Sequence, residues 1–179
     1  IELGLSTSPY LVENRLRNKV TGEVVNIEGS RAFSINTNKG EFCPEDFTLD
    51  KGEVKERKDC STINLRLTSY ELNMTVTYEV GKFDHFYRKW LEIVNKMDEN
   101  IVIKDITLWS INLPKISQLG VGPDLSYLFS ETGGGGFFSC IEFPYWDSHR
   151  GNLSYSPGYP LKPKEKYETE KAVTGVFKK

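Results

Sequence analysis

Hydrophobic and polar residues alternate along much of this chain with a period of two. The clearest run lies between Leu72 and Val80, where every second residue is Leu, Met, Val or Tyr and the residues between them are polar or charged. Successive side chains of a strand point to opposite faces, so this run predicts a strand with one buried face. A second run, from Phe83 to Val94, predicts the next strand.

The second run should present two different faces. Lys89, Leu91 and Ile93 fall on one of them, and Trp90, Glu92 and Val94 fall on the other. Further strands are predicted over residues 11–16, 23–27, 31–35, 63–67, 101–113 and 167–177. The alternation changes phase near Asp105-Ile106, which is typical of a β-bulge.

Three further expectations concern how these segments connect. Residues 72–113 resemble a three-stranded antiparallel meander. The charged stretch 41–58 is interpreted as a connection between strands. A short helix is predicted over 122–129, because Pro123 suits the first turn of a helix.

Many short strands separated by turn residues predict an all-β fold, a two-sheet antiparallel β-sandwich with few short helices. A length of 179 residues fits one domain, spanning 1–179. The chain lacks an initiator Met, and it stops within or just after a strand-like segment, 171–179. We therefore expect a domain excised from a longer, multidomain protein.

Composition and charge exclude several classes of partner. The net charge is −2 and no basic stripe is present, so nucleic acid is not expected. No apolar run approaches the roughly 20 residues that span a bilayer, so no membrane partner is expected. Cys43, Cys60 and Cys140 lack the paired spacing of a zinc site, and we expect neither a metal nor a cofactor. The sequence leaves open a Cys43–Cys60 disulfide or three buried thiols.

Four consecutive glycines, Gly133 to Gly136, precede a short apolar strand. Phosphate-binding loops space their glycines and follow them with a Lys and a helix, and neither feature occurs here. The glycines instead favour a tight fold or a close approach of the backbone to a partner. They lead into a loop, 145–150, that is dense in aromatic and polar side chains.

This loop supplies the candidate site residues, which are Tyr145, Trp146, Asp147, His149 and Arg150. Aromatic rings stack on the apolar faces of sugars, and Asp, His and Arg side chains hydrogen-bond sugar hydroxyls. The same residue types are typical of a surface that docks against another domain. The sequence does not separate carbohydrate binding from docking, and a Tyr-Trp pair that only covers the core is a third interpretation.

No catalytic residue is predicted. Glu142 and Asp147 are the best-placed pair for glycosidase chemistry, but solvated acids explain them more simply. Asp147 and His149 are too close in sequence to act as members of a catalytic triad. Arg88, beside Trp90, could stack across the sheet and hold a carboxylate with its fork, although a scaffolding role is favoured. Trp109 is expected in the core.

Several motifs resemble the N-terminal β-supersandwich domain of α-galactosidase-type glycoside hydrolases, in the galactose mutarotase-like superfamily. The first motifs are Tyr78-Glu79-Val80, the strand from Phe86 to Asn95, and the segment from Ile103 to Leu108. The later ones are Gly136-Phe137-Phe138, Ile141-Glu142-Phe143-Pro144, and the segment from Gly158 to Pro163. The resemblance covers roughly residues 70–177.

This resemblance implies a non-catalytic domain that packs on a (β/α)8 barrel and helps to complete its sugar pocket. In that family two aspartates of the barrel are catalytic, and nothing in this chain corresponds to the barrel. The related galactose mutarotases use a similar supersandwich with a catalytic His and Glu, and their histidines do not match His85 or His149. Two alternatives remain, a stand-alone carbohydrate-binding module for an oligosaccharide and a purely structural interaction domain.

Overall fold

The computed structural model describes residues 1–27, 30–110, 117–122, 125–132, 134–142 and 152–178, with 117–132 described by backbone pairing only. These residues form antiparallel strands and one short helix, the 3-10 turn η1 (Pro44–Asp46). In chain order the strands are β1 (Glu2–Ser6), β2 (Val12–Arg17), β3 (Val24–Asn26), β4 (Ser34–Thr37), β5 (Glu41–Phe42), β6 (Thr48–Glu56), β7 (Cys60–Thr68), β8 (Leu72–Gly81), β9 (Phe86–Asn95), β10 (Ile101–Ser110), β11 (Ser117–Gly122), β12 (Leu125–Thr132), β13 (Gly135–Ile141), β14 (Asn152–Tyr155), β15 (Tyr159–Leu161), β16 (Lys166–Glu168) and β17 (Ala172–Lys178). The predicted all-β class is confirmed.

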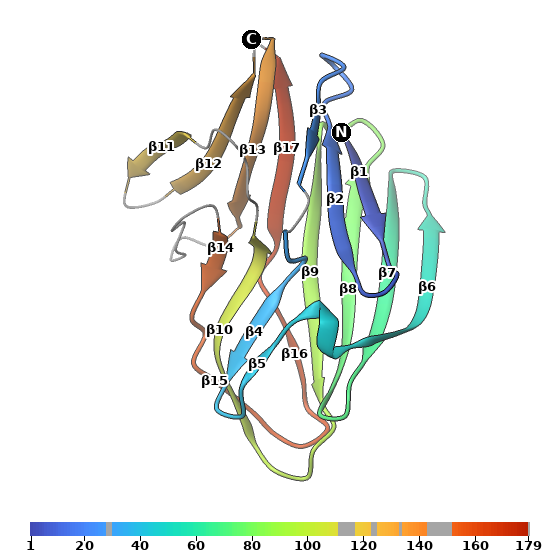
Figure 1. The fold of residues 1–179 in the computed structure, drawn as a ribbon, viewed down its shortest axis with the longest axis vertical. Helices are drawn as coiled ribbons and strands as arrows, with labels where there is room; N and C mark the ends of the chain where they lie inside the picture. The colour runs from blue at the N-terminus through green and yellow to red at the C-terminus, as the bar shows by residue number, and fades with distance from the viewer. Residues whose placement is uncertain (28–29, 111–116, 123–124, 133, 143–151, 179) are drawn as a thin grey trace.

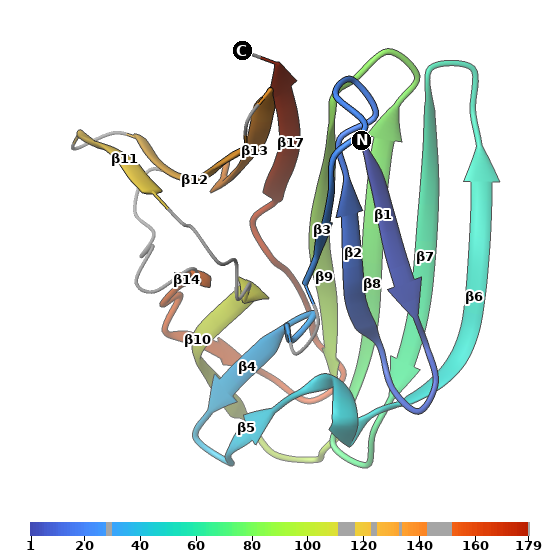
Figure 2. The same ribbon diagram turned by 45° about the horizontal axis from the view of Figure 1, so that its top comes forward.

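The strands form three sheets in two layers (Figures 1 and 2). The larger layer is a nine-stranded sheet with the order β11-β12-β13-β17-β9-β8-β7-β6, in which β16 also pairs with β9. Two smaller sheets form the other layer. One is β1-β2-β3, and the other is β14-β10-β4-β5 with β15 paired to β10.

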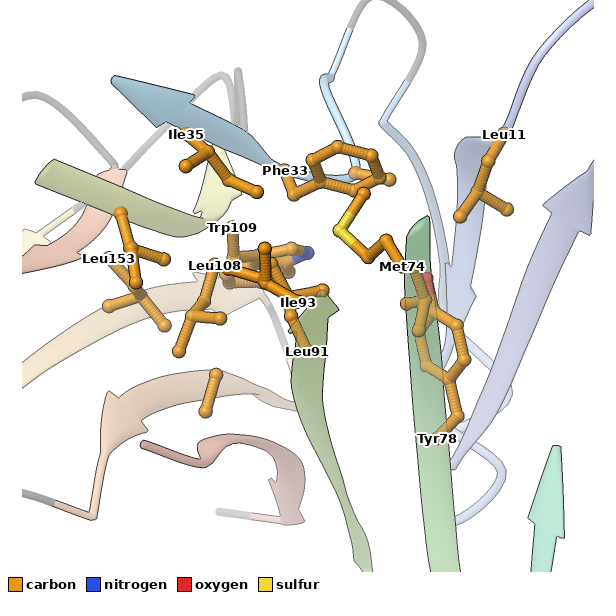
Figure 3. Close-up of a cluster of buried hydrophobic side chains, with 14 of the residues drawn as sticks. Leu11, Phe33, Ile35, Met74, Tyr78, Leu91, Ile93, Leu108, Trp109 and Leu153 are labelled. Carbon is orange, nitrogen blue, oxygen red and sulfur yellow. The ribbon is translucent and has the colours of Figure 1, made fainter. Parts of the chain in front are cut away.

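The core lies between these layers and is continuous across all three sheets. Figure 3 shows Phe33 and Met74 pointing toward one another, with Leu91 and Ile93 of β9 facing Leu108 of β10. These side chains are at most 2% exposed. Their burial follows from the alternation in β8 and β9, because each strand turns every second side chain toward the core.

The two predicted faces of β9 are confirmed. Lys89, Leu91 and Ile93 are buried, whereas Trp90, Glu92 and Val94 are only partly buried on the opposite face. A lysine therefore lies on the core side of the sheet. Trp109 is buried as expected, at 2% exposure.

The predicted bulge is also confirmed. In the pairing of β10 with β4 the register shifts between Ile103 and Asp105, so that Lys104 is the extra residue. A second shift, between Thr107 and Trp109, occurs where β10 pairs with β14. The two irregularities account for the change of phase seen in the sequence.

The expected meander over 72–113 is wrong. Strands β8 and β9 pair as predicted, but β10 leaves their sheet and pairs with β4, β14 and β15. The other edge of β9 is taken by β16 and β17. Residues 96–100 therefore form a corner between the two layers, and a single sequence does not reveal whether a polar turn closes a hairpin or such a corner.

The expected helix over 122–129 is also wrong, because residues 125–132 form β12. This strand pairs with both β11 and β13. Its backbone groups are satisfied by two neighbouring strands, and this outweighs the weak signal of one proline. The charged stretch 41–58 is likewise more than a connection, since it contains β5, η1 and the nine-residue strand β6.

All three cysteines are free thiols. Cys43 precedes η1, whereas Cys60 begins β7, and no disulfide joins them. Of the two expectations, three buried thiols is confirmed as to the thiols but only in part as to their burial. Cys43 is buried, and the other two are partly buried.

Candidate functional site

The candidate residues Tyr145, Trp146, Asp147, His149 and Arg150 lie outside the residues that the structure describes. The segments on either side of them are described. Glu142 follows β13 in the nine-stranded sheet, and Asn152 begins β14 in the five-stranded sheet. The predicted loop therefore connects the two layers, and its surroundings can be built from the strands at its start.

The loop starts beside a group of aromatic and charged side chains on the outer face of the nine-stranded sheet. Strand register places alternate residues of β9 on this face, because Arg88 lies opposite Val173 of β17, which in turn lies opposite Cys140 of β13. We call this group the outer ridge. It comprises Phe86, Arg88, Trp90, Phe138, Glu142 and Lys171.

Arg88 is the centre of the outer ridge. Its Nε donates a hydrogen bond to Glu142 Oε1 over 2.9 Å, and its guanidinium lies 4.8 Å from the centre of the Phe86 ring. The sequence suggested that this arginine could stack beside Trp90 and hold a carboxylate. The structure contains the carboxylate contact, but the stacked ring is that of Phe86.

Trp90 has a cation of its own. The Nζ of Lys171 lies 4.6 Å from the Trp90 ring, and the Glu142 amide donates to the Lys171 carbonyl over 2.8 Å. Cations over aromatic faces are attracted by the ring quadrupole. These contacts fix the end of β13, from which the predicted loop departs, against β9.

Gly175 allows Phe138 to lie on the outer ridge. A Cβ at this glycine would be 2.3 Å from Phe138 Cζ and 2.9 Å from Phe86 Cβ. The Phe138 ring therefore occupies the space over the glycine, next to Phe86. Any larger residue at position 175 would displace one of these two rings.

The opposite face of β9 carries a buried polar cluster that the sequence did not reveal. Lys89 Nζ lies 2.5 Å from Glu13 Oε1 and also donates to the carbonyl of Ala32. The Tyr78 hydroxyl donates to the same Glu13 oxygen over 2.8 Å. Lys89 and Glu13 are at most 1% exposed, so this ion pair joins β2 to β9 inside the core.

Burial sets the protonation of the groups in this cluster. It lowers the pKa of Lys89, while the neighbouring Glu13 carboxylate opposes that change. It raises the pKa of Tyr78 well above the ordinary value, and the charge of Glu13 adds to the effect. The signal for this cluster in the sequence is Lys89, because a lysine on the same face as Leu91 and Ile93 needs a buried partner. The alternation does not show that the partner is Glu13.

The glycine run has one described close approach. A Cβ on Gly135 would be 2.2 Å from the carbonyl oxygen of Phe177 in β17. Asn18, fully buried after β2, donates to that carbonyl over 3.0 Å. These contacts hold β13 tightly against β17, in keeping with the expected role of the glycines. Gly133 lies outside the described residues.

Little in the described part of the chain favours catalysis. Glu142 is held by Arg88, and Asp147, its predicted partner, is not described. Burial, followed by the charge of Glu142, raises the pKa of the Cys140 thiol to about 11, so this thiol is not activated as a nucleophile. In the described ranges no three His, Cys, Asp or Glu residues gather to hold a metal ion. None of the described helices has the length and apolar character of a membrane span.

Comparison with known proteins gives a likeness at the level of fold. No protein-family model matches the chain, and no curated protein matches its sequence. Among solved structures, it is similar to the galactosidase domain of the α-galactosidase–sucrose kinase AgaSK, with a TM-score of 0.54 and 13% identity. It is also similar to the GH36 α-galactosidase AgaA from Geobacillus stearothermophilus, with a TM-score of 0.54 and 11% identity. A third similar structure is a putative kojibiose phosphorylase from human microbiome, with a TM-score of 0.51 and 7% identity.

The coverage of these matches is uneven. Each one covers 94% of this chain, but only 32%, 32% and 23% of the respective partner chains. The chain therefore spans about a third or less of the length of the proteins it resembles. Its fold is that of the N-terminal β-sandwich domain of GH36 α-galactosidases, as the sequence motifs suggested.

Proposed function

We propose that this chain is a non-catalytic, carbohydrate-associated β-sandwich domain of an α-galactosidase-like glycoside hydrolase. In this proposal it packs on a catalytic (β/α)8 barrel of its parent protein and contributes to the sugar pocket. The observation that carries the proposal is the fold, which matches α-galactosidases over 94% of the chain while covering only 32% of theirs. A domain that makes up a third of such an enzyme has the remainder of the enzyme as its natural partner.

The outer ridge and the loop at 145–150 are the proposed contact with that partner. Partly buried aromatic and arginine side chains are typical of interface centres. Glu142 and Lys171 contact the ridge residues Arg88 and Trp90 where the loop leaves β13. The domain would present Tyr145, Trp146, Asp147, His149 and Arg150 toward the sugar from this position.

The absence of catalysis can be tested on the chain itself with aryl α-galactosides. We expect no turnover above the buffer rate, because Glu142 is engaged in an ion pair with Arg88. Turnover that disappears in Glu142→Gln or Asp147→Asn would overturn the non-catalytic assignment. Glu92→Gln, which changes another ion-paired acid on the same face of the sheet, is the control.

A second candidate function is a stand-alone carbohydrate-binding module, favoured by the half-buried aromatic rings of the outer ridge. Here mono- and oligosaccharides should give a saturable change in tryptophan fluorescence that is lost in Trp146→Ala. Trp109 is buried, so its fluorescence should not change when a sugar binds at the surface. A flat titration with every sugar would remove this candidate and leave docking to the barrel or a purely structural role.

A further inference from the structure

The edge of β1 leaves part of the core face of the large sheet uncovered. The order β1-β2-β3 makes β1 an edge strand. Figures 1 and 2 show this small sheet lying over β8 and β9, with β6 beyond its margin. Val54 of β6 and Ile63 of β7 lie opposite each other on the core-facing side of the sheet, yet Val54 is exposed and Ile63 is only partly buried.

An apolar groove runs along this margin. It has a volume of about 200 Å³ and is lined by Leu3 and Leu5 of β1, by Val54 and Ile63, and by side chains of β8 and β9. Val54 is 65% exposed, although it occupies a core-facing position. The space lies where the inward side chains of a fourth strand beside β1 would be found.

Exposed hydrophobic residues are concentrated here. The described residues include seven large hydrophobic side chains that are classed as exposed. Four of these seven, Val20, Val54, Val80 and Phe83, line this groove or the cleft that continues from it. Such clustering marks an interaction site, because scattered single residues would be the ordinary outcome.

The continuing cleft is basic. It has a volume of about 920 Å³ and shares Ile1, Ser61 and Val80 with the groove. Its exposed cations are Lys19, Arg57, Lys58 and Lys82, against two carboxylates, Glu56 and Asp84. None of these four cations forms an ion pair with a described acid. The cleft therefore suits negative charge at one end of the groove.

The two exposed edges of this side of the molecule differ in their protection. β6, the edge of the large sheet, has the sequence Thr-Leu-Asp-Lys-Gly-Glu-Val-Lys-Glu, and its charges discourage pairing with another chain. β1 has the sequence Glu-Leu-Gly-Leu-Ser, with one charged residue that is engaged by Arg15 of β2. Its edge therefore lacks the charges that block strand addition.

We propose that β1 accepts an extended polypeptide segment as a fourth strand, antiparallel to β1. This segment would have apolar residues at alternate positions, covering Val54 and Ile63, and acidic residues at its carboxyl end. The direction follows from the strands, since the amino end of β1, at Ile1, lies at the basic cleft. Main-chain hydrogen bonds would provide affinity, and the groove and cleft would provide specificity. The proposal is independent of the outer ridge, which lies on the opposite face of the large sheet.

The test uses a synthetic peptide of about eight residues that alternates Thr and Val and ends in two glutamates. We expect saturable binding to the whole chain, with NMR shifts concentrated in β1, β6 and β7. A peptide of the same sequence, N-methylated at the residues facing β1, should bind at least about tenfold more weakly, because it cannot donate the main-chain hydrogen bonds. Equal binding of the methylated peptide, or no binding of either, would refute strand addition.

Variants of the chain locate the site. Val54→Lys should weaken binding by about tenfold or more, because it places a charge in the apolar groove. Val24→Lys is the matched control, since Val24 is a strand valine with 51% exposure that lines neither the groove nor the cleft.

The basic cleft is tested by Lys58→Glu. This change should weaken binding of the acidic peptide and reduce the salt dependence of that binding. Two outcomes would contradict a peptide as the occupant of the groove. One is an unchanged peptide affinity in Val54→Lys. The other is a dimer of the chain that prevents peptide binding and that dissociates in Val54→Lys.

Discussion

At the scale of single residues, the most consequential contact is the ion pair between Lys89 and Glu13. Two charges inside a hydrophobic core are costly to desolvate, and removing one partner leaves the other unpaired. The Tyr78 hydroxyl shares the same carboxylate oxygen, so the three side chains act as one network. This network ties β2 of the small sheet to β9, the strand that carries the outer ridge on its other face.

Replacing Glu13 by Gln should therefore destabilise the fold strongly. We expect a loss of about 3–5 kcal/mol in the free energy of unfolding, measured by urea denaturation, because the Lys89 ammonium loses its counterion. The double variant Glu13→Leu/Lys89→Met should recover most of that loss. Glu2→Gln, which removes an exposed ion pair with Arg15, is the control and should cost at most about 1 kcal/mol.

The same variant should have a characteristic pH dependence. Burial already lowers the pKa of Lys89 from 10.5, and loss of the Glu13 charge lowers it further. Between the folded value and 10.5, the unfolded chain binds a proton that the folded chain does not, so stability rises with pH. Unfolding midpoints of Glu13→Gln should therefore increase relative to the parent chain as the pH is raised toward 10.5. A constant difference across this range would show that Lys89 does not carry the effect.

At the scale of elements, β9 organises the molecule because its two faces have different tasks. Its inner face contributes Leu91 and Ile93 to the core, and its outer face presents Arg88 and Trp90. Its neighbours are β8 on one edge and β16 and β17 on the other. The glycine of β17 that lies opposite Phe86 gives the outer face its shape.

Substitution of Gly175 by Ala tests that shape. The new Cβ would meet Phe138 and Phe86 at distances that no real contact tolerates, so one ring must move. We expect a loss of about 1–3 kcal/mol in a thermal or urea unfolding experiment. The double variant Gly175→Ala/Phe138→Ala should show a smaller loss than the two single changes added together.

A matched glycine on an exposed strand provides the control. In β6 a Cβ on Gly52 would meet only Leu65 Cδ2, at 3.4 Å. Gly52→Ala should therefore change stability by no more than about 0.5 kcal/mol. Similar losses for the two glycine variants would show that the cost at Gly175 does not come from crowding by the two rings.

At the scale of the whole molecule, the two layers are joined at the corner between β9 and β10. Asn95 is fully buried there, and its Nδ2 donates to the Glu99 and Leu161 carbonyls over 2.8 and 3.1 Å. Its Oδ1 accepts from the Met97 amide over 2.9 Å. One side chain therefore connects the end of the large sheet to β15 of the opposite layer.

Asn95→Ala should loosen both layers together. We expect a loss of about 1–3 kcal/mol, because the change leaves a buried amide and two carbonyls without their partner. Amide hydrogen exchange is the measurement, and protection should fall in both β9 and β10. Asn36→Ala, at an exposed hydrogen bond to Asp105, is the control and should leave both strands protected. A loss confined to β10 would indicate that the layers open separately.

The sequence by itself determined the all-β class, most strand positions in the first half of the chain, and the bulge in β10. These features depend on which side chains face the core, and a period of two records that directly. The sequence also separated the two faces of β9, with Lys89 on the side of Leu91 and Ile93. It offered stacking and carboxylate holding by Arg88 only as the less favoured alternative to a scaffolding role. Motifs within residues 70–177 pointed to the β-sandwich domain of α-galactosidases, whose fold the chain has.

Tertiary structure alone decided the rest. The exposed strand β6 has solvent on much of both faces and so leaves no alternation to read, while β12 is a strand because two neighbours pair with its backbone. Glu13 pairs with Lys89, which is 76 positions away, and Glu142 pairs with Arg88, which is 54 positions away. Gly175 makes room for Phe138, which is 37 positions away. Whether β10 continued a hairpin or turned into the opposite layer depended on the place that β17 takes beside β9. Local patterns report burial, but only the assembled sheets fix which distant segments meet.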